Sequence, residues 1–356
     1  MGRIRVAIAG LGNCASALIQ GVEYYRGKRE VEIPGLMHVN FGGYYVDDIE
    51  FVAAFEVNKL KIGRDISEAI WVEPNCCSKF SDVPRMGVEV LPGPISDGVA
   101  PHMFEAFKVN RNMKPVDVSE ALRVSEADML INYLPVGSRE ATRIYANAAI
   151  ESGCAFVNCI PEFIASDEYW ADKFEKAGLP VAGDDIKSQV GATILHRVLA
   201  ELFKDRGVYI DSTYQLNLGG NTDFLNMTVE SRLQTKRISK TEAVKSLISY
   251  DVQTRIGPSD YVSFLGDKKI CYIRINGKAF GELPLTLDAK LTVEDSPNSG
   301  GVVIDVIRAV KLALDRGISG PLISISSYAF KHPPTQIRDD EAKIWVEEFI
   351  EGKRDR

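Results

Sequence analysis

The 356-residue chain lacks long hydrophobic runs, clusters of basic residues, internal repeats and low-complexity tracts. No window reaches the roughly 18 apolar residues of a membrane helix, so we expect neither a transmembrane segment nor a membrane partner. The net charge of −7 and the lack of a Lys/Arg run argue against a nucleic-acid partner, because no basic surface is predicted for a phosphate backbone. Small molecules are therefore the expected partners.

Cysteine and histidine are also scarce, and neither has the spacing of a metal site. The six cysteines form no Cys-x-x-Cys pair and several lie in apolar runs, which indicates buried reduced thiols rather than a disulfide framework. The four histidines are interpreted as ordinary polar or core residues. The N-terminal segment MGRIRVAIAGLGNC has no long apolar stretch and no cleavage site, so we expect a cytoplasmic location.

The chain begins with a strand, a glycine turn and a helix. Residues 3–9 alternate as a short strand, and apolar residues from Ala15 onward recur at helical spacing. Between them, Gly10-Leu11-Gly12-Asn13-Cys14-Ala15 is the G-x-G-x-x-A form of a dinucleotide-binding loop, whose glycines let a pyrophosphate approach the helix N-terminus. The pattern predicts cofactor binding by Gly10, Gly12, Asn13 and Cys14. An ordinary glycine turn is the alternative.

A second predicted strand, residues 49–55, ends at Glu56. A carboxylate at this place can accept the ribose hydroxyls and repel a 2′-phosphate, which favours NAD over NADP. Glu56 stands 44 positions after Gly12, whereas the usual spacing is about 20. Residues 27–48 are therefore predicted to be an insertion.

Three further pairs of a strand and a helix follow, which is the pattern of a parallel sheet. The predicted strands are residues 129–134, 155–159 and 179–182, and the predicted helices are residues 138–151, 167–176 and 190–205. Ligands of such sheets lie beyond the carboxyl ends of the strands. The three loops at these ends contain Leu134 and Pro135, residues 158–161, and residues 183–188.

The last of these loops, Asp184-Asp185-Ile186-Lys187-Ser188, precedes a helix that contains Gly191 and Thr193. The N–H groups at the start of that helix could hold a phosphate. The alternative is that one of the aspartates only caps the helix while Lys187 is solvated.

From residue 208 the pattern changes to long amphipathic strands, predicted at residues 208–218, 269–275 and 285–293, with a hairpin turn at Asn276-Gly277. A buried helix is predicted at residues 299–316, and a strand at residues 322–328 that would rejoin the first sheet. The chain is thus predicted to be an α/β protein, a Rossmann-type doubly wound parallel sheet with an inserted α+β domain built on a largely antiparallel sheet. The predicted domains are residues 1–205 for the cofactor, 206–298 for catalysis and oligomerisation, and 299–356 as the return to the Rossmann domain.

Polar residues gather in the segment between Gly219 and Lys240, which contains Asn221, Asp223, Asn226 and Lys236. Ser239-Lys240-Thr241-Glu242 has the form of a capping box, which predicts Lys240 in a first helical turn, where the helix dipole disfavours a cation. An anionic ligand between the two lysines would remove this conflict, and two solvated surface lysines are the alternative. By themselves, Lys269 and Lys331 are interpreted as surface charges, and Asp295 as part of a loop whose Ser299 caps the next helix.

These patterns together resemble one enzyme family across almost the whole chain. The segments GNCASALIQGVEYY, PGLMHV, NYLPVGS, GDDIKSQVGATILHR, LNLGGNTDFLN, KRISK, GPSD and EDSPNSGG, in this order, are similar to the myo-inositol-1-phosphate synthases, in particular their shorter bacterial and archaeal branch. The resemblance implies an NAD-dependent isomerase that converts D-glucose 6-phosphate to 1D-myo-inositol 3-phosphate. It further implies a homotetramer and a divalent cation, zinc or magnesium, for which no ligand set stands out.

The resemblance also assigns roles to individual residues. It implies that lysines serve as charge stabilisers and proton relays, that aspartates orient a lysine or lie near the nicotinamide, and that further polar residues hold the sugar and its phosphate. The catalytic candidates are Lys236, Lys240, Lys269, Lys331, Asp185, Asp223 and Asp295. The cofactor candidates are Gly10, Gly12, Asn13, Cys14, Glu56, Leu134, Pro135, Asp185 and Asp295, and the substrate candidates are Ser188, Gly191, Thr193, Asn221 and Asp223.

Two other classes of protein share the two-domain plan. An NAD-dependent dehydrogenase of the homoserine or semialdehyde type would form NADH with net turnover. A nucleotide-sensing regulatory protein would keep the fold without the chemistry, although such a protein has no need for four lysines.

Overall fold

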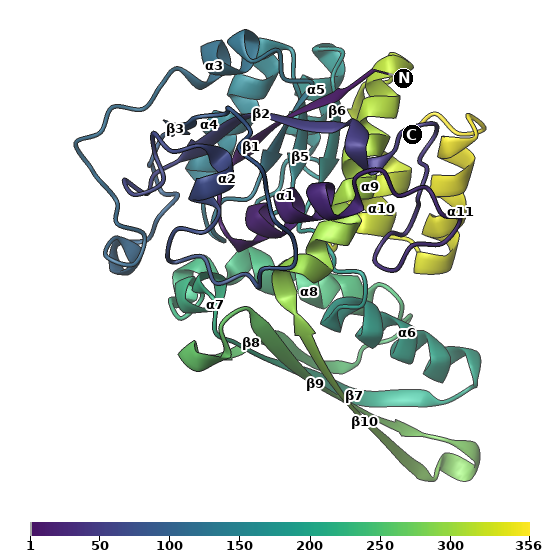
Figure 1. Cartoon of the computed structure of the whole chain (residues 1–356). Coiled ribbons are helices and arrows are strands. Elements are labelled where there is room, and N and C mark those ends of the chain that lie inside the picture. Colours follow the sequence, from purple (N-terminus) through teal and green to yellow (C-terminus); the bar gives the residue numbers. More distant parts are fainter. Residues whose placement is uncertain (1) are drawn as a thin grey trace.

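Seven parallel strands form the larger of two sheets in the computed structural model (Figure 1). The structure describes residues 2–356 apart from the side chains of Pro258 and Ser259, so part of the GPSD segment lies outside the described residues. The strands are β1 (Ile4–Ala9), β2 (Ile49–Glu56), β3 (Val90–Pro92), β4 (Met129–Asn132), β5 (Ala155–Asn158), β6 (Pro180–Gly183) and β11 (Gly320–Pro321). Their order is β11-β6-β5-β4-β1-β2-β3, so the order reverses at β1 and β4, where ligands bind in doubly wound sheets.

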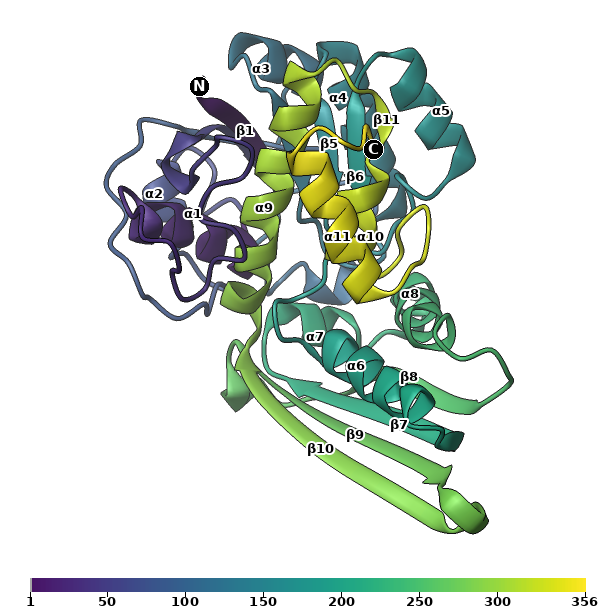
Figure 2. The ribbon, with the colours of Figure 1, turned by 90° about the vertical axis from the view of Figure 1, so that its right-hand side faces the viewer.

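Helices cover both faces of this sheet, which is why β4, β5 and β6 are buried at every position (Figure 2). One face packs against α1 (Asn13–Tyr25), α2 (Ile66–Ala69), α9 (Asp295–Asp315), α10 (Ile323–Ala329) and α11 (Asp339–Ile350). The opposite face packs against α3 (Val118–Val124), α4 (Arg139–Ser152) and α5 (Glu168–Lys176). Short 3₁₀ helices lie at Val46–Asp48, Pro101–Met103, Glu230–Arg232, Ser263–Leu265 and Phe280–Glu282.

The second sheet has four strands in the order β10-β9-β7-β8. They are β7 (Tyr209–Gly219), β8 (Gln253–Tyr261), β9 (Lys268–Lys278) and β10 (Pro284–Glu294). β9 is antiparallel to both β7 and β10, with Lys269 opposite Val293, whereas β7 and β8 are parallel. The β9–β10 hairpin extends away from the larger sheet in both views (Figures 1 and 2).

Helices α6 (Ala192–Asp205), α7 (Thr222–Asn226) and α8 (Gln234–Lys245) accompany the second sheet, and α6 packs its apolar side on β7 and β9. The predicted α/β class, a doubly wound parallel sheet with a second sheet-based unit, is confirmed. By its packing, α6 belongs with the second sheet, although the sequence places it within residues 1–205. The domain boundaries themselves remain a prediction.

One predicted strand is wrong. Residues 322–328 form most of α10 instead, and the strand that rejoins the sheet is only β11. A short apolar run cannot be assigned to strand or helix by periodicity, and here burial among α9, α11 and β6 decides for the helix.

The predicted hairpin turn at Asn276-Gly277 is also wrong, because both residues pair with β10 inside β9, and the chain turns at residues 279–283. A Cβ on Gly277 would lie 2.5 Å from the carbonyl oxygen of Tyr209, so glycine is needed here for a close approach of strands.

The predicted helix caps Ser239 and Ser299 are both wrong, because each serine lies inside its helix and not before it. Helix α8 begins at Gln234, so Lys236 lies in the first turn and Ser239 lies inside the helix. Helix α9 begins at Asp295, and Ser299 lies inside it, where its hydroxyl donates to the carbonyl of Ser296 at 2.9 Å.

Candidate active site

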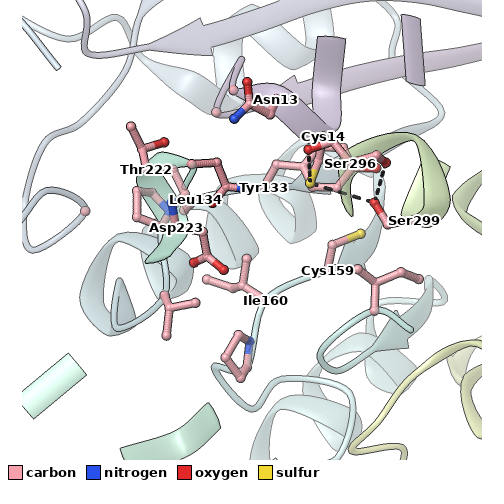
Figure 3. Close-up of a pocket in the computed structure, with 18 of the residues that line it drawn as sticks. Asn13, Cys14, Tyr133, Leu134, Cys159, Ile160, Thr222, Asp223, Ser296 and Ser299 are labelled. Carbon is pink, nitrogen blue, oxygen red and sulfur yellow. Dashed lines mark hydrogen bonds between the residues drawn. The ribbon is translucent and has the colours of Figure 1, made fainter. Parts of the chain in front are cut away.

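A large pocket lies between the two sheets and brings together most of the predicted site residues (Figure 3). Its lining includes Gly10, Gly12, Asn13, Cys14, Glu56, Leu134, Pro135, Asp185, Ser188, Asn221, Asp223, Lys236, Lys240, Lys269, Asp295 and Lys331. Figure 3 shows the glycine-loop residues Asn13 and Cys14 on one side and Asp223 and Thr222 of α7 near Leu134 on the other. Gly191 and Thr193 are not among the lining residues; Gly191 precedes α6, and Thr193 is buried in its first turn.

The glycine loop leaves space and free amides at the start of α1. Gly10 has a φ of +90°, and a Cβ there would lie 2.8 Å from the carbonyl oxygen of Tyr133, so only glycine fits. At Gly12, in contrast, a Cβ would meet no atom within 4 Å. Gly12 precedes α1 without a side-chain cap, so the first N–H groups of the helix face this space. The loop therefore fits the pyrophosphate of a dinucleotide.

Asn13 and Cys14 have different surroundings. The Asn13 side-chain oxygen accepts the backbone N–H groups of Cys76 and Cys77 at 2.7 and 3.1 Å, so it holds a distant segment against the loop. Burial, followed by the charges of Asp267 and Asp295, raises the pKa of the Cys14 thiol to about 12. Cys14 is thus an unreactive thiol in the pocket wall.

Three of the four predicted lysines form ion pairs with the three predicted aspartates. Lys236 Nζ lies 2.6 Å from Asp223 Oδ2, and Lys269 Nζ lies 3.0 Å from Asp295 Oδ1. Lys331 Nζ lies 2.8 Å from Asp185 Oδ1 and also donates to the carbonyl of Ile186. These lysines come from α8, β9 and the segment after α10, so the site is assembled from remote parts of the chain.

Lys240 is different, since no ion pair joins it to a carboxylate among the described side chains. Its side chain is buried, with 4% of the residue exposed. Burial lowers the pKa of Lys240 well below its ordinary value, and the charges of Lys236, Lys269 and Lys331 lower it further against the opposing effect of Asp185. Lys240 is therefore a buried amine whose neutral form is favoured more than that of an ordinary lysine. The solvated-lysine alternative is wrong for Lys236 as well, which is 9% exposed.

Asp185 links the lysine helix to the larger sheet. The Ser239 hydroxyl donates to its Oδ2, while Lys331 occupies Oδ1. Burial would raise the pKa of Asp185, but Lys331 and Lys236 outweigh burial and hold that pKa below its ordinary value. Ser239 is thus a bridge to a charged carboxylate rather than a helix cap.

The neighbouring Asp184 has a structural role. Its carboxylate accepts the backbone N–H groups of Ile164, Ala165 and Ser166, together with the Ser166 hydroxyl. Lys187 is not solvated, as it is 2% exposed and its Nζ lies 2.8 Å from Asp339 of α11. The capping alternative therefore describes neither Asp185 nor Lys187.

Asn221 holds α7 and meets a carboxylate that the sequence reasoning missed. Its side-chain oxygen accepts the N–H groups of Asp223 and Phe224, and its Nδ2 donates to Asp267 Oδ1 at 3.0 Å. Asp267 also accepts the N–H and hydroxyl of Ser296. Burial, and then the charge of Asp295, raises the pKa of Asp267 to about 6. Its position two residues before Lys269 was the available signal.

The segment of residues 219–240, which carries Lys236 and Lys240, is hydrogen-bonded directly to the loop after β4. The carbonyl of Val136 accepts Asn226 Nδ2 at 2.9 Å and Arg232 Nε at 2.8 Å. Arg232 also donates to the carbonyl of Asp97. Asn226 therefore anchors the segment rather than facing the pocket.

Comparisons with known proteins agree with this arrangement. A family model described as myo-inositol-1-phosphate synthase matches residues 191–296. Inositol-3-phosphate synthase of Mycolicibacterium smegmatis is 55% identical over 359 residues, which cover 99% of both chains. The enzyme of the same name from Corynebacterium glutamicum is also 55% identical, over 98% of both chains. The chain belongs to the myo-inositol-1-phosphate synthase family.

Solved structures of similar proteins have the same fold as this synthase-family chain. The crystal structure of Ari2 is 35% identical, with a TM-score of 0.80 over 98% of this chain and 99% of that one. A myo-inositol-1-phosphate synthase-related protein from Thermotoga maritima is 27% identical, with a TM-score of 0.76 over 98% of both chains. The expectation that the chain is an enzyme of this family is thereby confirmed.

The expected divalent cation has no evident ligand set in this synthase-family site. Among the side chains that the structure describes, no group of three or more His, Cys, Asp and Glu residues could hold a metal ion. These residues therefore do not fit a resident cation, and the cation remains an expectation from the family resemblance. No helix in the described part of the chain is both long and apolar enough to cross a membrane.

Proposed function

We propose that the chain is an NAD-dependent inositol-3-phosphate synthase that converts D-glucose 6-phosphate to 1D-myo-inositol 3-phosphate. The observation that carries this proposal is the unpaired, buried Lys240 among three paired lysines, beside a dinucleotide-binding loop. Relatives at 55% identity that bear this enzyme's name support it.

NAD, when bound, would supply a hydride acceptor that becomes a hydride donor later in the same turnover. The residues that would hold it are those of the glycine loop with Leu134 and Pro135, because they surround the open space at the start of α1. Asp185 and Asp295 line the same pocket, each with a lysine in contact, and we assign them to the nicotinamide end.

The lysines would act on the open-chain sugar. Once C5 is a ketone, loss of a proton from C6 gives an enolate, and a new C6–C1 bond leaves negative charge on the C1 oxygen. Lys240 in its neutral form would take the C6 proton, and an ammonium would give a proton to the C1 oxygen. Lys236, Lys269 and Lys331 would stabilise the oxygen charges in a site that excludes much of the water.

The remaining candidates would hold the substrate. Asn221 fixes the start of α7, and Asp223 keeps Lys236 in place, so both would shape the sugar-binding side. Ser188 faces the pocket and would receive the phosphate, whereas Gly191 and Thr193 could take part only through the backbone at the start of α6.

The test is a product assay with purified protein, glucose 6-phosphate and a catalytic amount of NAD. We expect periodate-sensitive inositol phosphate without net NADH, with a chelator and metal add-back series deciding the cation requirement. Net NADH without inositol phosphate would instead support the dehydrogenase alternative, and NAD binding without either product would support the sensor.

The proposed assembly is a homotetramer. On the outer side of the second sheet, Leu216 and Tyr272 pair across β7 and β9 and are each 40% exposed, and Leu283 near the hairpin tip is 67% exposed. Exposed apolar side chains are typical of an interface, and the same face also carries the exposed Arg274–Asp288 ion pair. Light scattering coupled to size-exclusion chromatography tests the state, and a monomer at assay concentration would contradict it. A cytoplasmic location and the absence of nucleic-acid partners remain predictions.

A further inference from the structure

Both polar groups of Leu11, the residue between the two glycines of the cofactor loop, are held from outside the loop. The Leu11 N–H donates to Glu56 Oε1 at 3.2 Å. The Leu11 carbonyl accepts Lys61 Nζ at 2.7 Å and Asn75 Nδ2 at 3.1 Å. The shape of the glycine loop therefore depends on three side chains that the G-x-G-x-x-A pattern does not contain.

Glu56 and Lys61 are themselves a buried pair, with 7% and 1% of each residue exposed. Lys61 Nζ lies 3.4 Å from Glu56 Oε1 and donates to Asn75 Oδ1 at 2.9 Å. The other carboxylate oxygen of Glu56 accepts the N–H groups of Val57 and Asn58 at 2.7 and 3.0 Å. A carboxylate has about four acceptor sites, so donors from this chain already occupy those of Glu56. A ribose hydroxyl would have to share one of them.

The pair presents only its negative member to the cofactor. Glu56 lines the pocket, whereas Lys61 is not among the lining residues. Burial would raise the pKa of Glu56, but the nearby Lys61 ammonium and the backbone N–H groups outweigh burial and hold the pKa below its ordinary value. Glu56 thus keeps its charge in a place where an unpaired carboxylate would be costly.

We propose that Lys61 is a positioning residue for the dinucleotide: with Glu56 it clamps the Leu11 peptide and holds the glycine loop in the form that accepts NAD, while the Glu56 carboxylate disfavours NADP. The inference rests on the proposed use of NAD. Lys61 acts through Leu11 and Glu56 and does not touch the cofactor.

The experiment is the substitution Lys61→Met, which keeps the length of the side chain and removes its charge. We expect the KM and the Kd for NAD to rise about tenfold or more, as for loss of a buried hydrogen bond to a charged group. The kcat at saturating NAD should stay within about threefold of the wild-type value, since the side of the pocket with Lys236, Lys240, Lys269 and Lys331 is unchanged. The preference for NAD over NADP should persist, because the Glu56 carboxylate stays in place and loses only its compensating charge. Calorimetry gives the Kd values, and the product assay gives KM and kcat.

Lys59→Met is the matched control, because Lys59 is an exposed lysine two residues away, and its constants should equal those of the wild type. The double variant Glu56→Gln with Lys61→Met removes the unpaired carboxylate, so it should regain part of the NAD affinity and lose the discrimination against NADP. A Lys61→Met protein with wild-type NAD affinity, or one that loses kcat alone, would overturn the proposal.

Asn75→Ala keeps the inference testable if Lys61→Met does not fold. It removes one of the two donors to the Leu11 carbonyl, and an NAD Kd raised about threefold is expected; an unchanged Kd would overturn the inference. A wild-type protein that binds no NAD would instead sink the proposed function, which separates the two failures.

Discussion

The two halves of the pocket hold their charges in different ways. The glycine-loop half uses backbone N–H groups and one compensated pair, Glu56 with Lys61, so its electrostatics are balanced before any ligand arrives. The lysine half places four lysine side chains against three carboxylates and, among the described side chains, leaves Lys240 without a carboxylate partner. A balanced site suits a cofactor that returns unchanged, whereas an unbalanced one suits a substrate whose oxygens become charged during the reaction.

The strongest test of this contrast is Lys240→Met, which removes only the unpaired amine. We expect turnover to fall about a thousandfold, the scale of a lost general base, while the Kd for NAD stays near the wild-type value. The product assay and calorimetry measure the two effects. Lys245→Met, at the exposed end of the same helix, is the control and should retain activity. Equal losses of turnover and NAD affinity would mean that the two halves are not separable.

Replacing only the carboxylate partner of a paired lysine should lower kcat less than replacing Lys240 does. Asp223→Asn leaves Lys236 in place but removes the charge that orients it, so we expect kcat to fall about thirtyfold. Steady-state kinetics provide the measurement, and Asp251→Asn, which alters an exposed partner of Lys245, is the control. Unchanged kcat would show that the ion pair does not position Lys236.

The unpaired lysine should also reduce stability. The folded-state pKa of Lys240 lies well below the ordinary value of 10.5, so between these two pKa values the unfolded chain binds the extra proton. Stability therefore rises with pH between the lowered pKa and 10.5, and the cost is present below that window. Lys240→Met should raise the free energy of unfolding at pH 7 by about 1–2 kcal/mol. Urea unfolding at pH 7 and pH 9 tests this, and a destabilised variant would refute it.

Asp267 should affect the pH dependence of stability without changing turnover directly. Its folded-state pKa is about 6 and its ordinary value 3.8, so the folded chain holds this proton more tightly. The resulting stabilisation is complete below 3.8 and is lost as pH rises through about 6. Asp267→Asn cannot titrate, so it should flatten this part of the stability profile by up to about 3 kcal/mol, the free-energy equivalent of the pKa shift. Urea unfolding between pH 4 and 7 is the measurement, and an unaltered slope would contradict the assignment.

The glycine-loop half is readable from the sequence because its signal is local. Gly10 and Gly12 stand two residues apart, and the requirement for glycine at Gly10 comes from a contact with the next strand of a standard fold. Lys61 could not be found in this way. Along the chain it resembles Lys59, and only the approach of Leu11 and Glu56 makes one lysine buried and the other exposed.

Lys236 and Lys240 were found from their sequence context, whereas Lys269, Lys331 and Asp295 were assigned by family resemblance. Local reasoning placed the starts of α8 and α9 incorrectly. Ser239 has the sequence context of a cap, yet its hydroxyl serves Asp185, which is 54 positions away. Likewise, Gly277 follows asparagine as in a hairpin turn, although its small size serves a contact with β7. In each case a distant partner overrides the local preference.

The pairing of β9 with β10 has a consequence for how the chain tolerates insertions and deletions. Lys269 stands opposite Val293 at the base of the hairpin. Val293 lies two positions before Asp295, the first residue of α9, whose carboxylate pairs with Lys269. Because side chains alternate between the faces of a strand, a slip by one residue would turn Lys269 away from the pocket and break its contact with Asp295. The tip at residues 279–283 can therefore vary in length as long as the strands keep their alignment, whereas the loss of a single residue within β9 would inactivate the enzyme without touching a catalytic side chain.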